Sequence, residues 1–284
     1  MATQLARLPE VERLSPRCIR ILGGNPGKFT LQGTNTYLVG TGPSRLLIDT
    51  GEGKPSWIAA VKRTLAEEKA SIASAVITHW HPDHQGGIEH LLEISPHTKV
   101  YKNQPEEGQV EITDGQKFEV EGATLTAVHS PGHTVDHMVL LLQEEDAMFT
   151  GDNVLGLGTA VFEDLSAYLS SLEKMKGLFS GRAYPGHGPP LADGPAKITE
   201  YIRHRRQRED QVIQTLRSKR AEIEASESNT WTPMELVKVI YSDVPETLHP
   251  AAAGGVTQIL HKLQEEGKVS AEGGRWRLSS RSPL

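Results

Sequence analysis

The sequence predicts an α/β protein in which two β-sheets pack face to face under helices on both outer faces, an αββα sandwich, followed by a small C-terminal domain. Short apolar segments of strand length alternate with segments of helical period, and a sheet pair with outer helices is the natural packing of such a series. A polar stretch over residues 221–229 then precedes a helix start signal at Thr232. We therefore expect a first domain over residues 1–220, a linker over residues 221–229 and a second domain over residues 230–284.

Short strands dominate the first third of the chain. Segments with the apolar content of strands are found at residues 18–22, 35–39, 45–49 and 73–78. Among them, residues 57–69 have helical spacing, because Trp57, Ile58, Val61 and Leu65 fall on one face. This region therefore supplies strands together with one covering helix.

The middle of the chain continues the alternation. Helices are expected at residues 87–93, 164–178 and 197–220. Strands are expected at residues 99–101, 119–120, 124–129, 137–143, 147–150 and 182–184. These segments complete the two sheets and their outer helices.

The second domain begins with a strong helix start. Thr232 is a capping residue, Pro233 suits the first helical position, and Glu235 suits the third. Helices over residues 234–241 and 250–266 and strands over residues 268–270 and 275–278 follow. This order is helix, helix, strand, strand.

The composition is that of an ordinary globular protein. The chain has 284 residues, of which 37% are hydrophobic and 23% charged, and a formal net charge of −6, which disfavours a dedicated nucleic-acid surface. The sequence contains no run of about 18 apolar residues, so we expect no membrane-spanning helix. The N-terminus lacks the apolar core of a signal peptide. One cysteine, Cys18, cannot form an internal disulfide, so we expect a reducing, cytoplasmic location.

Histidines and aspartates gather at three places in the sequence. The residues of ligand type are His79, His81, Asp83, His84, His133, Asp152 and His187. Imidazoles and carboxylates suit zinc, manganese or iron. Seven ligands are too many for one closed tetrahedral ion, so the pattern predicts two ions that share a bridging carboxylate and a water. A solvated histidine-rich loop is the alternative, and four ligand-type residues within six positions argue against it.

The spacing of the first cluster places it at the end of a strand. His79 and His81 point to the same side of an extended segment, because side chains alternate along a strand. Pro82 then ends the strand, and Asp83 and His84 begin a helix. Open α/β sheets place their sites at this end of their strands.

These motifs resemble those of the metallo-β-lactamase superfamily. The H-x-H-x-D-H run followed by distant His, Asp and His is highly specific for it, and the segments at residues 33–39, 48–51 and 149–152 match as well. Within the superfamily, the chain looks most like the fungal polyketide-pathway thioesterases that act on atrochrysone carboxyl-ACP, and next like an animal mitochondrial endoribonuclease. The resemblance implies the αββα sandwich and a winged-helix-like C-terminal domain.

The resemblance also implies a role for each candidate ligand. One ion would be held by His79, His81 and His133. The other would be held by Asp83, His84 and His187, and Asp152 would bridge the two. Zinc is the expected metal, with manganese as the alternative, and Asp83 is implied as a catalytic proton shuttle.

Residues beside the ligands have two interpretations each. Asp49 ends an apolar strand, where it either accepts a hydrogen bond from a ligand imidazole or caps a turn. His137 and Asp136 lie just past His133, and either orient the ligand loop or contact substrate. The glycines beside the ligands are expected to let the backbone approach the metals and to adopt positive φ; they are Gly86, Gly87, Gly132 and Gly186.

Metal-assisted hydrolysis is the chemistry that fits the sequence, which has neither a G-x-S-x-G elbow nor a Walker A loop. The resemblance implies a thioesterase that releases a polyketide acid from an acyl carrier protein, using a hydroxide formed at the dinuclear centre. A single-strand-specific endoribonuclease is the alternative. A purely structural metal is disfavoured, because structural zinc sites are closed shells of four ligands.

One segment has a local excess of positive charge. Residues 197–220 carry eight basic and three acidic side chains. They form either a solvated helix face with pairs such as Arg205–Glu209 and Arg206–Asp210, or a patch that attracts anions. We expect an acyl carrier protein and a small acyl thioester as partners, with no membrane.

Overall fold

The computed structural model describes residues 5–218 and 230–279. The chain packs as two compact units, one made of residues up to 162 together with 167–199, and the other made of residues 163–166 and those from 200 onward. The first unit holds both large sheets. The linker expected over residues 221–229 lies outside the described residues, and the domain limits inferred from the sequence stay predictions.

The first sheet has seven strands that follow chain order, mixing antiparallel and parallel pairs. β1 to β4 are mutually antiparallel, and β4 to β7 are parallel. The strands are β1 (Val11–Ser15), β2 (Cys18–Leu22), β3 (Asn35–Val39), β4 (Ser44–Ile48), β5 (Ser71–Ile77), β6 (Lys99–Lys102) and β7 (Val110–Glu111). β1 and β7 were not expected from the sequence, and each lies at an edge of the sheet.

The second sheet has five strands in the order β12, β11, β10, β9, β8. Its strands are β8 (Lys117–Val120), β9 (Ala123–His129), β10 (Met138–Leu142), β11 (Ala147–Gly151) and β12 (Ala183–Pro185). All are antiparallel except β11 and β12, which run parallel. A short 3₁₀ turn, η1 (Gln143–Glu145), joins β10 to β11.

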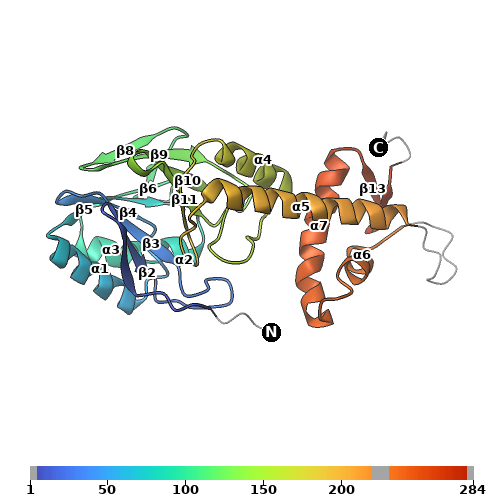
Figure 1. The fold of residues 1–284 in the computed structure, drawn as a ribbon, viewed down its shortest axis with the longest axis horizontal. Coiled ribbons are helices and arrows are strands. Elements are labelled where there is room, and N and C mark those ends of the chain that lie inside the picture. The colour runs from blue at the N-terminus through green and yellow to red at the C-terminus, as the bar shows by residue number, and fades with distance from the viewer. Residues whose placement is uncertain (1–4, 219–229, 280–284) are drawn as a thin grey trace. The chain divides into compact units, whose positions relative to one another are not determined.

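Two apolar cores separate the layers of the first unit. One lies between the sheets and includes Tyr37, Ile48 and Phe149, while the other lies between the first sheet and its helices and includes Trp57 and Leu91. The helices of the second core are α1 (Pro55–Glu68) and α3 (Ile88–Ile94), on the side of the first sheet away from β8 and β9 (Figure 1). Burial on both faces explains why the central strands are rich in apolar residues.

Helices also cover the second sheet. α4 (Leu165–Lys176) buries Tyr168, Leu172 and Met175, and α5 (Gly194–Arg217) begins beside β12, where Gly194 approaches Ala183. The αββα sandwich inferred from the sequence is therefore confirmed.

The second unit contains a compact helical domain with a two-stranded sheet. It comprises α6 (Pro233–Ile240), η2 (Glu246–Leu248), α7 (His249–Glu265), β13 (Val269–Glu272) and β14 (Arg275–Leu278). The side chain of Thr232 accepts a hydrogen bond from the Glu235 amide, and the side chain of Glu235 accepts one from the Thr232 amide, which is the expected capping box. Among the described residues, no helix is long and apolar enough to cross a membrane.

Candidate metal centre

The first group of candidate ligands follows β5. His79 and His81 extend past its last residue, Ile77, and Pro82 opens the four-residue helix α2 (Pro82–Gln85). Asp83 and His84 lie in this helix, and the backbone N–H of His84 donates to the His81 carbonyl at 2.9 Å. The turn therefore brings one strand end and one helix start to the same point, as the spacing predicts.

The remaining ligands come from the second sheet. His133 lies in the connection between β9 and β10, Asp152 follows β11, and His187 follows β12. The parallel pairing of β11 with β12 places Gly151 opposite Pro185, and the Gly186 N–H donates to the Gly151 carbonyl at 2.8 Å. Two ligands that are distant in sequence thus leave adjacent strand ends together.

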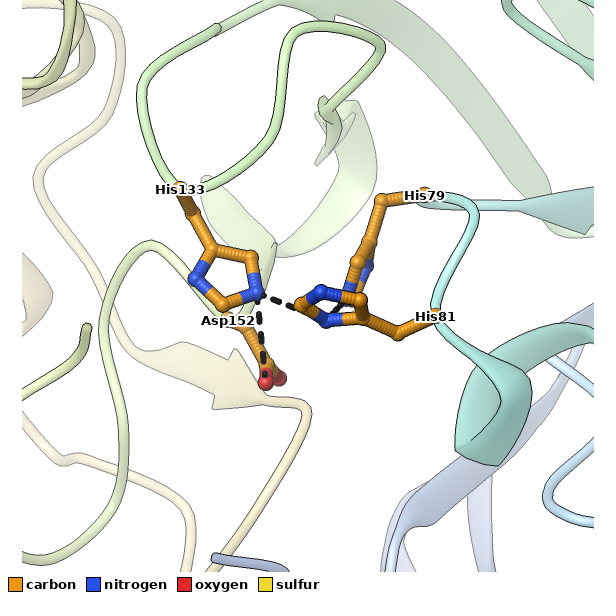
Figure 2. Close-up of side chains that lie close together, drawn as sticks. All are labelled: His79, His81, His133 and Asp152. Carbon is orange, nitrogen blue, oxygen red and sulfur yellow. Dashed lines mark hydrogen bonds and ion pairs between the residues drawn. The ribbon is translucent and has the colours of Figure 1, made fainter. Parts of the chain in front are cut away.

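Four ligand-type side chains converge in one cluster, drawn in Figure 2. They are His79, His81, His133 and Asp152, and their ligating atoms all lie within 4.8 Å of one another. His81 Nδ1 lies 3.0 Å from His79 Nε2 and 3.1 Å from His133 Nε2. His79 and His133 are buried, whereas His81 is half-buried and faces the cavity.

A second cluster lies beside the first. It consists of Asp83, His84 and His187, with ligating atoms again within 4.8 Å. Asp152 connects the two clusters, because one of its oxygens lies 3.3 Å from His84 Nε2 and the other 3.2 Å from His187 Nε2. The structure therefore brings all seven sequence-derived candidates together, in the two groups that the family resemblance implies.

Asp49 anchors the rings from behind. Its carboxylate accepts hydrogen bonds from the Thr78 amide at 2.8 Å, the Thr78 hydroxyl at 2.9 Å and His84 Nδ1 at 2.7 Å. Of the two interpretations of Asp49, the contact with a histidine ring is present, and the backbone amide that Asp49 caps lies after β5 rather than in its own turn.

His137 is buried and does not line the cavity. Its Nε2 accepts a hydrogen bond from the Asp152 backbone N–H at 3.1 Å, and the Asn153 side-chain amide lies 3.2 Å from its Nδ1. Of the two roles considered for His137, contact with substrate does not fit this position. The ring instead fixes the backbone at Asp152.

Comparison with known proteins places this arrangement in a family. Residues 29–187 match the family model described as the metallo-beta-lactamase superfamily, and residues 232–276 match the beta-lactamase associated winged helix domain. The chain belongs to the metallo-β-lactamase superfamily. Its described C-terminal helices and strands form the winged helix that is associated with this fold, as the sequence predicts.

Fungal relatives resemble the chain over nearly its whole length. It is 49% identical to the atrochrysone carboxyl ACP thioesterase of Aspergillus chevalieri, covering 95% of this chain and 88% of that protein. It is 48% identical to the lactamase-like protein adaB of Aspergillus niger, covering 95% and 87%. With the family membership, these relations make the chain a hydrolase of the metallo-β-lactamase superfamily.

Solved structures of low sequence identity share the fold. A metallo-beta-lactamase family protein from Thermus thermophilus has a TM-score of 0.72 at 22% identity, covering 94% of this chain and all of that one. A beta-lactamase domain protein from Burkholderia ambifaria has a TM-score of 0.79 at 15% identity, covering 95% and 93%. The arrangement of sheets and helices is therefore that of the superfamily.

The hydrogen bonds around the site fit the divalent metal that this membership implies. The Thr78 hydroxyl donates to Asp49, so it accepts from His79 Nδ1 at 2.9 Å, and His133 Nδ1 donates to the Val161 carbonyl at 2.8 Å. Because a neutral imidazole carries one N–H, the Nε2 atoms of His79 and His133 point lone pairs at the same space. A cation is the partner that converging lone pairs require.

The electrostatics of the second cluster lead to the same conclusion. Burial lowers the pKa of His187, but Asp152 and Asp83 raise it to about 9. Burial raises the pKa of Asp83, but its hydrogen bond to His187 and the charge of His84 lower it to about 2. The negative charges of Asp83 and Asp152 therefore favour positive charge in the cluster, and a divalent ion would supply that charge.

The sequence did not reveal the groups that hold Asp83 and the end of β12. The Thr34 hydroxyl donates to Asp83 Oδ2 at 2.9 Å, and the Asn25 side chain is hydrogen-bonded to the amide and hydroxyl of Thr34. Asn35 Nδ2 donates to the carbonyls of Pro185 and Gly188, both at 2.8 Å. These are long-range contacts of common residue types, and no local pattern marks them.

The expected glycine conformations hold only in part. Of the four glycines singled out, Gly132 alone has a positive φ, of 129°, so that expectation was wrong for Gly86, Gly87 and Gly186. Close packing explains them better: a Cβ on Gly186 would lie 2.3 Å from Asp152 Oδ1.

A cavity of about 440 Å³ opens over the metal centre. His81, Asp83, His133, Asp152 and His187 form its floor. Two segments line the rest, residues 28–31 and residues 155–161, and they contribute mostly apolar side chains, namely Phe29, Leu31, Leu155, Leu157, Ala160 and Val161. Among the described residues of this lining, Lys28 is the one lysine or arginine.

Proposed function

We propose that the protein is a metal-dependent thioesterase that releases a polyketide acid from an acyl carrier protein. The observation that carries the proposal is the relation to the A. chevalieri thioesterase, which extends over 95% of the chain at 49% identity. The cavity supports it, because an apolar lining over the metal centre suits an aromatic or polyketide acyl group.

The metal centre would act in the following way. One divalent ion would be held by His79, His81 and His133, the other by Asp83, His84 and His187, with Asp152 between them. Two such ions, zinc by expectation or manganese, supply Lewis acidity that polarises a carbonyl and lowers the pKa of a water. The low pKa of Asp83, about 2, keeps its carboxylate ionised at neutral pH, as a metal ligand must be.

The rest of the site positions the acyl group. Phe29 and Val161 are exposed at 71% and 60% and belong to the two different segments of the lining, where they can contact a broad acyl group. The leaving thiol needs little assistance, since a thiol of the cysteine type has a pKa of about 8.5.

The C-terminal cations argue against ribonuclease activity. Lys262 pairs with Glu209 at 2.8 Å and with Glu266 at 2.5 Å, and Lys268 pairs with the same two carboxylates. Arg275 pairs with Glu235 at 3.0 Å. Nucleic-acid binding gains its affinity from cations that neutralise phosphates, and these cations already have carboxylate partners.

The carrier protein would dock on α5. Glu209 of this helix pairs with Lys262 and Lys268, which removes one of its three acidic side chains from the outer face. Arg203, Arg206 and Arg217 are exposed with Glu200 and Asp210 on the described part of the helix, so this face has a small excess of positive charge. Carrier domains are typically acidic, and opposite charges steer association.

The test compares two substrates on metal-loaded protein. An aromatic acyl-ACP thioester and a labelled single-stranded RNA are incubated in parallel, with and without chelator, and the Asp152→Ala variant serves as the inactive control. We expect chelator-sensitive cleavage of the thioester and intact RNA. Cleavage of RNA with an untouched thioester would overturn the proposal in favour of the nuclease.

A further inference from the structure

A buried ion pair lies behind the metal centre, outside the set of ligands. Lys102 is the last residue of β6 and is 3% exposed, and Asp136 is 1% exposed. The Lys102 ammonium lies 2.6 Å from Asp136 Oδ2 and donates to the carbonyls of Asn103 and Gln104, both at 3.0 Å. Asp136 Oδ1 in turn accepts the Thr134 hydroxyl at 2.7 Å.

Asp136 belongs to the ligand loop, defined here as residues 130–137. This loop carries His133, and it is closed by the Ser130 N–H, which donates to the His137 carbonyl at 2.9 Å. The loop connects β9 to β10 of the second sheet, whereas Lys102 ends β6 of the first sheet. The ion pair therefore joins the two sheets beside the site.

A buried ion pair is a weak source of stability, because removing two charges from water offsets most of their attraction. What such a pair supplies is a fixed distance and orientation between the two segments that carry the paired side chains. Here that constraint acts on the loop that presents His133. His79 and His81 come from the end of β5 in the first sheet, so the geometry of the first cluster depends on how the ligand loop sits against that sheet.

The second cluster has other supports. Asp49 holds His84, Thr34 holds Asp83, and Asn35 holds the backbone around His187. None of these contacts involves Lys102 or Asp136. The two clusters therefore differ in what they require from the ion pair.

We propose that Lys102 and Asp136 are positioning residues that hold the ligand loop in place, so that the metal site of His79, His81 and His133 depends on this ion pair and the other site does not. The inference rests on the metal-dependent function proposed above. On this inference, the ion pair that joins the two sheets also supports the ligand geometry of this metal site.

The test measures metal binding rather than activity. Zinc is titrated against a chromophoric chelator in the wild-type protein, in Asp136→Asn and in the double variant with Lys102→Met and Asp136→Asn. Asp114→Asn serves as the matched control, because Asp114 also pairs with a lysine, at 3.4 Å, but is exposed. The double variant leaves no unpaired charge inside the protein, so weakened metal binding at an unchanged melting temperature of the metal-free protein separates positioning from stability.

We expect both variants to bind one ion with wild-type affinity and the other at least tenfold more weakly, the usual scale for a lost supporting contact. Two ions bound as in wild type, or both weakened equally, would overturn the inference while leaving the proposed hydrolase intact. A wild-type protein that binds no divalent ion would overturn the proposed function and the inference together.

Discussion

Single residues behind the ligands determine which ring nitrogen faces the metal centre. Asp49 accepts three hydrogen bonds, two from Thr78 and one from His84 Nδ1. Thr78 is then left as an acceptor for His79 Nδ1. One carboxylate thus sets the orientation of a histidine in each cluster, directly for His84 and through a hydroxyl for His79.

Asp49→Asn should therefore weaken metal binding and hydrolysis together. The amide cannot accept all three hydrogen bonds in the same geometry, and loss of such a partner typically reduces metal affinity about 10- to 100-fold. Zinc titration and kcat/KM for the thioester check this. Wild-type affinity in the variant would mean that the rings do not need Asp49.

Three substitutions among the candidate ligands should abolish hydrolysis and preserve the fold. They are His79→Ala, Asp83→Ala and Asp152→Ala. The changes at His79 and Asp83 would each leave one ion short of a ligand, and the change at Asp152 would leave both short. Activity assays with metal analysis and circular dichroism test this. Near wild-type activity with bound metal in any of the three would contradict the dinuclear assignment.

At the scale of elements, the ligand loop packs tightly on α4. Gly132 has φ of 129°, and a Cβ at this position would lie 2.3 Å from the backbone of Tyr168. Tyr168 also donates through its hydroxyl to the Asn153 carbonyl at 2.6 Å, next to Asp152. A change at Gly132 therefore presses the helix against the loops that carry His133 and Asp152.

Gly132→Ala should lower stability and metal affinity. Gly158→Ala is the matched control, because Gly158 also has positive φ, of 76°, yet nothing lies within 4 Å of its added Cβ. The control should cost only the backbone strain, about 1–2 kcal/mol. Chemical denaturation should show a clearly larger loss of unfolding free energy for Gly132→Ala. Equal losses in the two variants would mean that α4 moves to accommodate the added methyl group without cost.

The cationic face of α5 makes a separate prediction. Reversing Arg203 and Arg206, which are both exposed, to Glu should raise KM for a carrier-bound thioester and leave KM for a small free thioester unchanged, because only the carrier meets this face. Lys238→Glu, also exposed and in the second unit, is the control. An equal rise for both substrates would remove the docking role.

The elements also show what the sequence can predict. The sequence pattern located β2, β3 and β14 to the residue, from a run of strand-forming residues in β2 and β3 and from alternating polar and apolar residues in β14. β1 and β7 were not predicted, because they lie at sheet edges, where less burial means a weaker pattern of apolar residues. In the site, the ligands form motifs, whereas Thr34, Asn35 and Lys102 act through contacts that only the folded chain creates.

At the scale of the whole molecule, the metal centre joins both sheets. His79, His81, Asp83 and His84 follow a strand of the first sheet, and His133, Asp152 and His187 belong to the second. A bound ion would therefore link the two sheets, and anything that binds only the folded state stabilises it.

Removing the metal should accordingly lower the melting temperature. Ions present at about 100 times their dissociation constant contribute about 2.7 kcal/mol. In a domain of this size that corresponds to a shift of roughly 5–10 °C. Differential scanning calorimetry with and without chelator measures the shift, and the Asp152→Ala variant should show little or none. An unchanged melting temperature in wild-type protein would argue against ions that connect the sheets.

The contact between Asn35 and residues 185–188 has a consequence for biogenesis. β3 is made early, but its partner at the end of β12 leaves the ribosome roughly 5–20 s after His79, at ordinary rates of synthesis. Until then the second sheet lacks β12, and the histidines that follow β5 lack His187 as a partner. The nascent chain therefore cannot hold the complete set of candidate ligands until His187 has emerged, and full metal loading has to follow that point of synthesis.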